Sequence, residues 1–313
     1  MTALVCGSMA YDTIMVFEDQ FKNHIIPDQA HILNVCFFVP SMRREFGGCA
    51  GNIAYNLKLL GGEPRILATV GDDFDSYKYQ LDKHQLDASF VKHIHGTFTA
   101  QAFITTDKDN NQITAFHPGA MSYAHQNDFQ SAVKDMKIGI VAPDGKEAMH
   151  ENARQFVAAG VPFVFDPGQG LPMFSGDELK VFIDQADYVI VNDYESKMLQ
   201  EKTGWDETQM AENLKGFIVT RGGEGSQIYH DGIMSQIPPA PISKSVDPTG
   251  CGDAFRGGLL YGLLNGKKWK ETGRIASLCG AIKIEHGGTQ NHTFTREEFI
   301  ERYEQSFAAE ISL

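Results

Sequence analysis

The sequence lacks the features that would place its protein in a membrane or in an oxidising compartment. Its 313 residues include only five cysteines, with no C-x-x-C pair, so neither a disulfide framework nor a zinc site is predicted. No apolar run approaches the roughly 20 residues that a bilayer requires. The start, MTALVCGSMAYD, lacks the charged segment and apolar stretch of a secretory signal. We therefore expect a protein of the cytoplasm with no membrane partner.

Positive charge is also scarce. The chain has 27 Lys and Arg against 40 Asp and Glu, a formal net charge of −13. A surface that follows a nucleic-acid backbone needs a basic excess, so nucleic acids are excluded as partners. Apolar residues make up 42% of the chain, and a chain of about 300 residues buries roughly 75% of its unfolded surface. The protein is therefore globular, and its length alone leaves one or two domains open.

Short β-type runs alternate with helical stretches along most of the chain. The strand cores are continuous apolar runs, which is typical of strands that are buried on both faces. We predict an α/β protein with a doubly wound, mainly parallel sheet and helices on both faces. The predicted strands lie at 3–7, 65–71, 138–143, 162–166, 188–192 and 216–223, and the predicted helices at 50–60, 75–85, 147–159 and 177–185.

Two stretches break this alternation and predict a small accessory sheet. Residues 12–46 carry β-type runs at 13–17 and 32–39 without a long helix, and residues 98–118 form two alternating segments around a polar turn at 107–111. Insertions that meet over the carboxyl edge of a parallel sheet would form a lid that excludes water from reacting groups. A surface hairpin or a dimer contact is the alternative, and a lid can serve both purposes.

The densest motif is DPTGCGDAFRGG, which starts at Asp247 and enters a helical run. Gly250 and Gly252 permit close approach to the backbone just before the helix begins, so several N–H groups and the positive helix end face one point. This arrangement predicts an anion hole. Asp253 lies in the first helical turn, near enough to accept a proton from a hydroxyl that attacks a bound phosphate. A purely structural glycine turn is the alternative.

The same segment does not match the common phosphate-binding fingerprints. A dinucleotide motif would need glycine where Phe255 stands, and the P-loop lysine and hydroxyl are absent. Arg256 follows Asp253 by three residues and could add positive charge near the site; we favour the alternative, an ion pair on the helix surface. Gly257 and Gly258 would weaken an exposed helix by roughly 1 kcal/mol each, so they indicate close packing against a neighbouring strand.

Other polar residues stand at predicted turns. Gly47 and Gly48 precede a helix that carries Asn52, and these groups can bind the hydroxyls of a ligand; a helix cap is the alternative. Asp144 and Asp166 follow predicted strands at the ligand edge of the sheet. Each is a candidate to contact substrate or metal-bound water, and a simple turn explains each of them about as well.

Five motifs in this order resemble those of the ribokinase family of sugar and nucleoside kinases, also called the pfkB carbohydrate kinase family. The motifs are Gly7-Ser8 with Asp12, Gly47-Gly48 with Asn52, Asn192 to Glu195, Thr220 to Gly225, and Asp247 to Asp253. Together they span nearly the whole chain. Since residues near 12–52 and near 192–253 must meet in one cleft, we expect one domain over residues 1–313, with the lid as part of it.

The resemblance implies a role for each matching residue. Asp253 is the expected catalytic base. Asp247, with backbone carbonyls near Thr249 and around His286–Gly288, resembles a monovalent-cation loop, so K⁺ joins Mg²⁺ as an expected cofactor. The other implied roles are the phosphoryl anion hole for the backbone of Gly250, Cys251 and Gly252; substrate hydroxyl binding for Asp12, Gly48 and Asn52; Mg²⁺ positioning through water for Asn192 and Glu195; and ATP binding for Asn192, Thr220, Gly222 and Gly225.

The choice of substrate rests on the predicted hairpin. Nucleoside kinases need a flat apolar surface for a base, and Phe103 and Phe116 offer one; stacking gains about 1–3 kcal/mol. The alternative is that these rings hold the lid together. The segments GGCAGNIAYNL and AFHPGAM are similar to those of bacterial adenosine kinase-like and broad-specificity nucleoside kinases. We expect ATP-dependent phosphorylation of the 5′-hydroxyl of a purine ribonucleoside, with a sugar kinase or a non-catalytic nucleoside sensor as alternatives.

The chain departs from the commoner family pattern in three places. Pro248 replaces a second Thr, Cys251 replaces Ala, and Thr220-Arg221 stands where a Lys often begins the phosphate turn. The missing Lys leaves the preferred phosphate donor open. Relatives in the family often pair through their lid sheets, so a homodimer through the lid is a further expectation.

Overall fold

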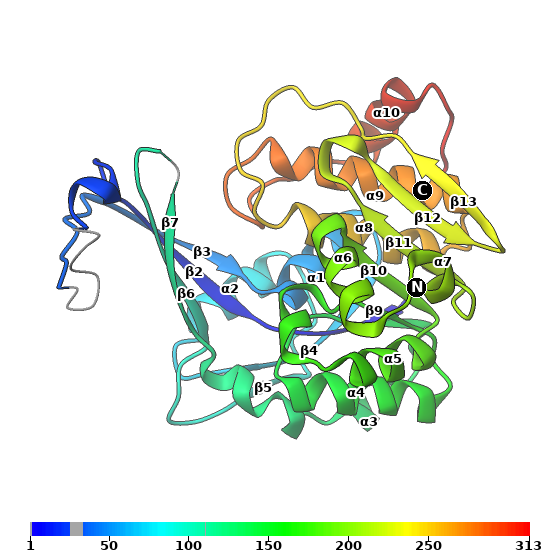
Figure 1. The fold of residues 1–313 in the computed structure, drawn as a ribbon, viewed down its shortest axis with the longest axis horizontal. Coiled ribbons are helices and arrows are strands. Elements are labelled where there is room, and N and C mark those ends of the chain that lie inside the picture. The colour runs from blue at the N-terminus through cyan, green and yellow to red at the C-terminus, as the bar shows by residue number, and fades with distance from the viewer. Residues whose placement is uncertain (1, 26–33, 110) are drawn as a thin grey trace.

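Two β-sheets organise the computed structural model, which describes residues 2–25, 34–109 and 111–313. The large sheet has nine strands in the order β13-β12-β11-β10-β9-β8-β1-β4-β5, and the small sheet has four in the order β3-β2-β6-β7 (Figure 1). The strands of the large sheet are β1 (Thr2–Cys6), β4 (Glu63–Val70), β5 (Val91–His93), β8 (Ile138–Val141), β9 (Phe163–Phe165), β10 (Tyr188–Asn192), β11 (Gly216–Thr220), β12 (Ser226–His230) and β13 (Ile233–Ile237). The strands of the small sheet are β2 (Ala10–Val16), β3 (Ser41–Gly47), β6 (Ala100–Thr106) and β7 (Gln112–His117).

The large sheet is parallel from β5 to β11, and β12 and β13 add an antiparallel hairpin at one edge. Its central strands are buried along their length, as the continuous apolar runs predicted. The α-helices are α1 (Cys49–Leu59), α2 (Asp75–Lys83), α3 (Phe129–Ala132), α4 (Lys146–Ala159), α5 (Gly176–Gln185), α6 (Asp193–Thr203), α7 (Glu207–Ala211), α8 (Cys251–Leu264), α9 (Trp269–Ile284) and α10 (Arg296–Phe307). Short 3₁₀ segments lie at η1 (Phe21–Asn23), η3 (Gly119–Gln126), η4 (Gly168–Met173) and η5 (Gly222–Glu224).

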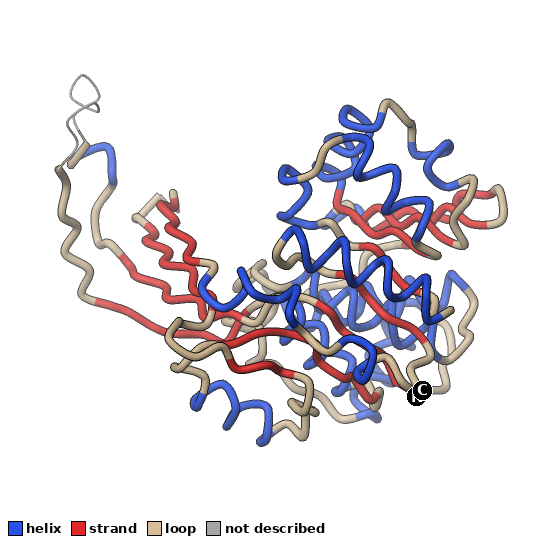
Figure 2. The backbone as a smooth tube through the Cα atoms, turned by 90° about the horizontal axis from the view of Figure 1, so that it is seen from below, coloured by secondary structure: helices blue, strands red, loops and turns tan. Residues whose placement is uncertain are grey.

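Helices cover both faces of the large sheet and enclose two apolar cores (Figure 2). One core includes residues of α1, α2, α8, α9 and α10, and the other includes residues of α3 to α7. The predicted doubly wound architecture is therefore confirmed. None of the described helices combines the length and the apolar character that a membrane crossing requires.

The two glycines inside α8 pack against helices. A Cβ on Gly257 would lie 2.7 Å from the Cβ of Asn56 in α1, and one on Gly258 would lie 2.6 Å from the Cα of Ala276 in α9. The expected close approach is real, but the prediction of a neighbouring strand as the partner is wrong. Because α8 lies between two helices, its backbone approaches both of them closely.

The small sheet combines the two stretches that broke the alternating pattern. The β6–β7 hairpin lies where the sequence predicted it, although Asn110 of the predicted turn lies outside the described residues. β2 overlaps the predicted run at 13–17 but begins at Ala10 and ends at Val16. The predicted strand at 32–39 is wrong for residues 34–39, which form no strand, and residues 32 and 33 lie outside the described residues. β2 pairs with β6 on one side and on the other with β3, which begins directly after Pro40; proline lacks the N–H that a strand-pairing hydrogen bond would use.

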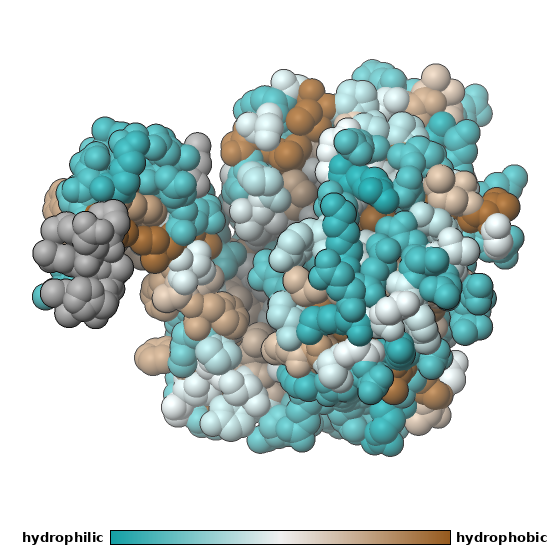
Figure 3. Space-filling view, in the orientation of Figure 1, coloured by the Kyte–Doolittle hydropathy of each residue, from teal (hydrophilic) through white to brown (hydrophobic). Residues whose placement is uncertain are grey.

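The small sheet projects from one side of the molecule, at the left of Figure 1. β2 leaves the body shortly after β1 ends at Cys6, and β3 leads back into α1. On the face shown in Figure 3 the surface is hollowed between the small sheet and the rest of the protein.

Candidate active site

The site lies where the strand order of the large sheet changes direction. β1 has β8 on one side and β4 on the other, and open α/β sheets bind ligands beyond the carboxyl ends of the strands at such a point. Four of the predicted residues follow this edge in order. Thr220 ends β11, Asn192 ends β10, Asp166 follows β9, and Asp144 follows β8.

Asp253 and Asn52 meet in this cleft from two helices 201 residues apart in the sequence. The Asn52 side-chain amide donates to the Asp253 carboxylate at 2.8 Å. Gln290 in turn donates to the Asn52 oxygen at 3.0 Å and lies 2.8 Å from the Tyr77 hydroxyl. Because Asn52, Gln290 and Tyr77 are all buried, one Asp253 oxygen is held in a fixed position and the other is left for a ligand. The sequence did not identify Gln290, whose only local signal is the glycine pair Gly287-Gly288 before it.

The half-buried carboxylate of Asp253 is poised to accept a proton near neutral pH. Burial raises its pKa to about 6, while Asn52 and the Arg256 guanidinium act in the opposite direction. A general base works best when its pKa lies close to the working pH, because the carboxylate is then ionised and still basic. Asp253 meets this condition.

The first turn of α8 presents free backbone donors beside Asp253. Gly250 caps the helix with φ 78°, a left-handed conformation that favours glycine. In the described parts of the chain, the N–H groups of Gly250, Gly252 and Asp253 have no acceptor, whereas the N–H of Cys251 donates to the Pro248 carbonyl at 3.2 Å. A helix N-terminus with free N–H groups attracts anions. In the described residues, Gly250, Gly252 and Asp253 thus keep their N–H groups available for an anion, whereas the N–H of Cys251, which the sequence also predicted as a donor, is already bound to Pro248.

Arg256 is buried, so the prediction of a surface ion pair is wrong. Its guanidinium binds the buried Asp166 carboxylate through Nε and Nη2, the latter at 2.6 Å, and Nη1 donates to the Gly252 carbonyl at 3.1 Å. Since both oxygens of Asp166 bind Arg256, Asp166 holds the first turn of α8 in place. The structure does not support the predicted contact of Asp166 with metal-bound water.

Asp12 lies on β2 at the base of the small sheet. A Cβ on Gly47 would lie only 2.5 Å from the Asp12 carboxylate, so glycine lets this carboxylate lie against the backbone of β3. Gly48 has φ 84°, and a Cβ there would lie 2.6 Å from the Ser8 carbonyl oxygen. Burial, and then the charges of Glu45 and Asp247, raise the pKa of Asp12 to about 6. The predicted hydroxyl-binding residues are therefore brought to the entrance of α1.

Strand register separates the two phenylalanines of the hairpin. Asp12 pairs with Ala102, which pairs with Phe116, so these three residues form one row on one face of the small sheet. Phe103 belongs to the next row and points to the opposite face. Phe116 is 53% exposed on the face of Asp12. The prediction that Phe103 contacts the same ligand as Asp12 is wrong, because neighbouring residues of a strand face opposite ways.

Asn192 and Glu195 form a capping box at the start of α6. The Asn192 side chain accepts from the Glu195 N–H at 2.7 Å, and Glu195 Oε2 accepts from the Asn192 N–H at 2.8 Å. This leaves Glu195 Oε1 as the oxygen available in the cleft. Burial raises the pKa of Glu195, and the nearby Arg256 opposes that rise. One available carboxylate oxygen fits Mg²⁺, which keeps several of its waters in protein sites.

The turn after β11 provides an open glycine surface. Gly222 has φ 52°, and a Cβ built there meets no atom within 4 Å. Gly225 has φ 88°, and a Cβ there would lie 2.1 Å from the Ile237 carbonyl oxygen. Arg221 donates to Gln227 at 2.7 Å, so it does not replace the missing phosphate lysine. Thr220 and the two glycines remain the predicted receptor for a nucleotide.

Asp144 is buried after β8, and its carboxylate accepts from the Gly145 N–H at 2.8 Å. Burial raises its pKa to about 7. Within the part of the chain that the structure describes, it makes no hydrogen bond to another predicted site residue. Its one described hydrogen-bond partner is thus the backbone of its own turn, and a contact of Asp144 with substrate stays a prediction.

The Asp247 loop does not fit a bound monovalent cation. Its carboxylate accepts from the N–H groups of Thr249 and Gly288, each at 2.9 Å. The ammonium group of Lys283, a residue that the sequence analysis did not single out, donates to the Asp247 carbonyl oxygen at 2.7 Å. The expected K⁺ site therefore contains a cationic side chain of the protein itself.

Comparison with known proteins identifies a matching family and several relatives. The family described as pfkB family carbohydrate kinase matches residues 19–296. The Burkholderia thailandensis nucleoside kinase in complex with inosine has a TM-score of 0.90 and 50% identity, covering 98% of this chain and 99% of that chain; its ADP-inosine complex has 0.87 and 51%, covering 98% and 97%. A Methanocaldococcus jannaschii nucleoside kinase is 32% identical over 87% of this chain and 90% of its own. The probable fructokinase-7 of Arabidopsis thaliana is 26% identical over 80% and 81%.

Proposed function

The chain belongs to the pfkB family of carbohydrate kinases, and we propose that it transfers the γ-phosphoryl group of ATP to the 5′-hydroxyl of a purine ribonucleoside. Inosine, adenosine and guanosine are the proposed acceptors. In this proposal residues 1–313 work as one domain, and the small sheet is its lid. The reaction consumes ATP, so we place the protein in the cytoplasm.

The row of Asp12, Ala102 and Phe116 carries the choice of a nucleoside over a sugar. Neighbouring strands lie about 4.8 Å apart, so the row extends roughly 10 Å from the carboxylate to the aromatic ring. That length suits a ribose on Asp12 with its base against Phe116, because the small Ala102 leaves room between them. A free sugar would reach only the Asp12 end of the row.

Phosphoryl transfer then needs one proton acceptor and several anion donors. Asp253 takes the proton of the 5′-hydroxyl as the 5′-oxygen forms its bond to the γ-phosphorus, and the bond from that phosphorus to the β–γ bridging oxygen breaks to release ADP. The free N–H groups at the start of α8 stabilise the charge on the transferred group. Mg²⁺, held through water beside Glu195 and Asn192, would neutralise the β- and γ-phosphates.

Two contacts around the site hold the proposed base and anion hole in a fixed orientation. Asn52 fixes Asp253, and Arg256 fixes the carbonyl of Gly252 in the same turn. Small displacements of reacting groups lower a rate strongly, so a rigid base and anion hole favour catalysis. These contacts argue for a working kinase over a nucleoside sensor that has lost its activity.

A kinase assay with a panel of acceptors tests the proposal. We expect turnover with inosine, adenosine and guanosine in the presence of ATP and Mg²⁺, and much less with ribose or fructose 6-phosphate. ADP formation coupled to NADH oxidation measures the rate. Turnover of free or phosphorylated sugars alone would establish a sugar kinase of the same family.

The outer face of the small sheet supports the proposed homodimer. Met15, Met42, Phe103 and Ile113 fall on the face opposite to Asp12, and Met42, Phe103 and Ile113 are exposed there. An exposed apolar surface of this kind is typical of an interaction site. Analytical ultracentrifugation should give a dimer for the wild type and a monomer for Met42→Glu; a monomeric wild type contradicts this assignment.

A further inference from the structure

Lys283 lies among the oxygens that the resemblance assigned to a monovalent cation. The side chain stands in the last turn of α9 and is fully buried. Its Nζ donates to the backbone carbonyl oxygens of Asp247 at 2.7 Å and His286 at 3.3 Å, and lies 4.0 Å from the Asp247 carboxylate. These oxygens come from the two segments that would coordinate K⁺.

An ammonium group and K⁺ place the same demands on such a loop. Proteins hold K⁺ with carbonyl oxygens that replace its hydration shell, and a lysine ammonium offers three donors to oxygens in a similar arrangement. Two unit positive charges 4 Å apart repel by about 4 kcal/mol at an effective dielectric constant of about 20. The ammonium therefore excludes K⁺ from these oxygens.

The position of the charge connects it to phosphate binding. Burial lowers the pKa of Lys283, and the charges of Asp247, Cys251, Asp253 and Glu45 act in the opposite direction. Cys251 and Asp253 belong to the first turn of α8. The Asp247 carbonyl that Lys283 holds lies only three residues before the helix cap Gly250, so the ammonium stabilises the loop that presents the anion hole.

We infer that the Lys283 ammonium takes the place of the monovalent cation and makes this kinase independent of K⁺. The inference rests on the proposed kinase function for its effect on activity. Its structural part, the exclusion of K⁺ from the Asp247 loop, concerns only residues of this chain.

The wild type gives the first test. Its kinase rate and its melting temperature should be the same in KCl as in choline chloride of equal ionic strength. A rate that rises tenfold or more with K⁺, on the order of 1.4 kcal/mol of transition-state stabilisation, would overturn the inference. Sodium chloride serves as a second control for ionic strength.

Two variants of Lys283 give the second test. Lys283→Ala removes the ammonium and leaves space, so K⁺ or methylammonium should raise both its melting temperature and its rate. Lys283→Met removes the charge but fills the space, so these ions should have little effect on it. Equal responses of the two variants to K⁺, or no response of the alanine variant, would contradict the inference.

The melting temperatures separate this inference from the proposed function. If no acceptor is phosphorylated by the wild type, the proposed function fails, while K⁺-dependent stabilisation of Lys283→Ala still supports the replacement of the cation. If the kinase is active but its wild-type melting temperature rises with K⁺, the inference fails and the proposed function stands.

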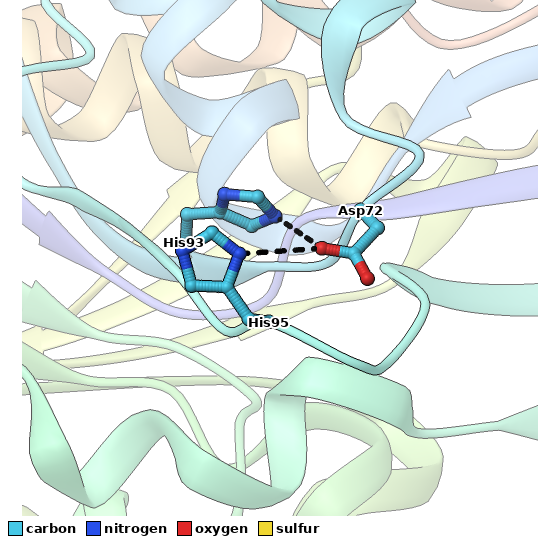
Figure 4. Close-up of side chains that lie close together, drawn as sticks. All are labelled: Asp72, His93 and His95. Carbon is cyan, nitrogen blue, oxygen red and sulfur yellow. Dashed lines mark hydrogen bonds and ion pairs between the residues drawn. The ribbon is translucent and has the colours of Figure 1, made fainter.

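A second, independent observation concerns a side-chain cluster outside the cleft. Asp72, in the turn after β4, lies beside His93 at the end of β5 and His95 two residues on (Figure 4). His93 Nε2 and His95 Nδ1 lie 2.9 and 3.6 Å from the same Asp72 oxygen, and one ligand atom from each of the three residues lies within 4.8 Å of the others. The Gly96 N–H donates to the other Asp72 oxygen at 2.9 Å, which orients the carboxylate.

The geometry points to a site for a divalent transition-metal ion at Asp72, His93 and His95. Two imidazoles and a carboxylate suit Zn²⁺, Co²⁺ or Ni²⁺, whereas Mg²⁺ prefers oxygen ligands. Ligands in tetrahedral zinc sites bind at about 2.0–2.2 Å, so the two rings need only small rotations toward a shared ion. The site is separate from the proposed Mg²⁺ position because its residues lie at the β4–β5 edge of the sheet.

Isothermal titration calorimetry with ZnCl₂ tests this site on protein without an affinity tag. We expect saturable binding by the wild type, and its loss in the His93→Ala/His95→Ala double variant. His84→Ala, on the C-cap of α2, is the matched control and should bind as the wild type does. Absence of binding by the wild type, or equal binding by the double variant, would overturn the assignment.

Discussion

Arg256 and Asp166 are 90 residues apart in the sequence and form a buried, two-pronged ion pair behind the first turn of α8. Arg256 also holds the Gly252 carbonyl. The pair therefore links the end of β9 to the helix terminus at which we propose the anion hole. The ion pair therefore positions the first turn of α8 and takes no part in the reaction itself.

Breaking this pair should destabilise the protein markedly. Asp166→Asn leaves the buried guanidinium without its counter-charge, so we expect the free energy of unfolding to fall by about 3–5 kcal/mol. Urea denaturation followed by circular dichroism measures the change. The control is Lys215→Met, which removes the ion pair between Lys215 and Asp187. Because the Lys215 side chain is largely exposed, this change should lower the free energy of unfolding by less than about 1 kcal/mol. Equal losses for the two variants would contradict the larger cost expected for breaking the buried pair.

Replacement of Asp253 separates chemistry from binding. Asp253→Asn keeps the shape of the side chain and removes the proton acceptor, so kcat should fall by about 10²–10⁴-fold. The dissociation constant for inosine, measured by calorimetry, should change little. Asp231→Asn in the β12–β13 turn is the control and should retain full activity. An unaltered kcat for Asp253→Asn would exclude this residue as the base.

The pH profile should report the ionisation of Asp253 and Asp12. Burial raises the pKa of each to about 6, and both carboxylates act in their ionised form. The value of kcat/KM should therefore be constant at neutral pH and fall as pH drops through about 6. The fall is about tenfold per pH unit for one group and steeper where both are protonated. A profile that stays flat down to pH values near 4 would contradict the pKa shifts.

The two hairpin phenylalanines provide a matched pair for substrate binding. Phe116→Ala should weaken nucleoside binding by about 1–3 kcal/mol, or roughly 5- to 150-fold in KM, because a base loses its stacking surface. Phe103→Ala, one row away on the other face, should leave KM unchanged. Initial rates with inosine measure both. A larger effect on KM at Phe103 than at Phe116 would contradict the proposal that the base lies on the Asp12 face of the small sheet.

The Asn52–Gln290 contact gives a further test of positioning. Gln290→Ala removes the donor that fixes the Asn52 oxygen, so Asn52 can turn away from Asp253. We expect kcat to fall about tenfold with a small change in KM, since the contact acts through Asp253 and not on the substrate. Melting temperatures of the variant and the wild type serve as the folding control. A rise in KM alone would indicate that Gln290 contacts the substrate instead.

The amino-acid sequence determined the alternating strands and helices, the glycine-marked start of α8 and the motif from Asn192 to Glu195. These features depend on interactions within a few residues: apolar runs that suit buried strands, and glycine or capping residues at helix ends. The same short-range rules predicted the β6–β7 hairpin. They failed at residues 34–39, where Pro40 and the pairing of β2 with β3 delay the strand to Ser41.

The tertiary structure decided which distant residues meet. The sequence does not reveal that Arg256, Lys283 and Gln290 bind Asp166, Asp247 and Asn52, respectively. Each of these contacts joins segments at least 36 residues apart. The sequence also does not reveal the strand register that places Phe103 and Phe116 on opposite faces of the small sheet. A shift of one residue in the register would exchange the two faces of a strand. Long-range packing and strand register therefore decided how the family motifs are arranged in the cleft and placed the Lys283 ammonium group beside Asp247.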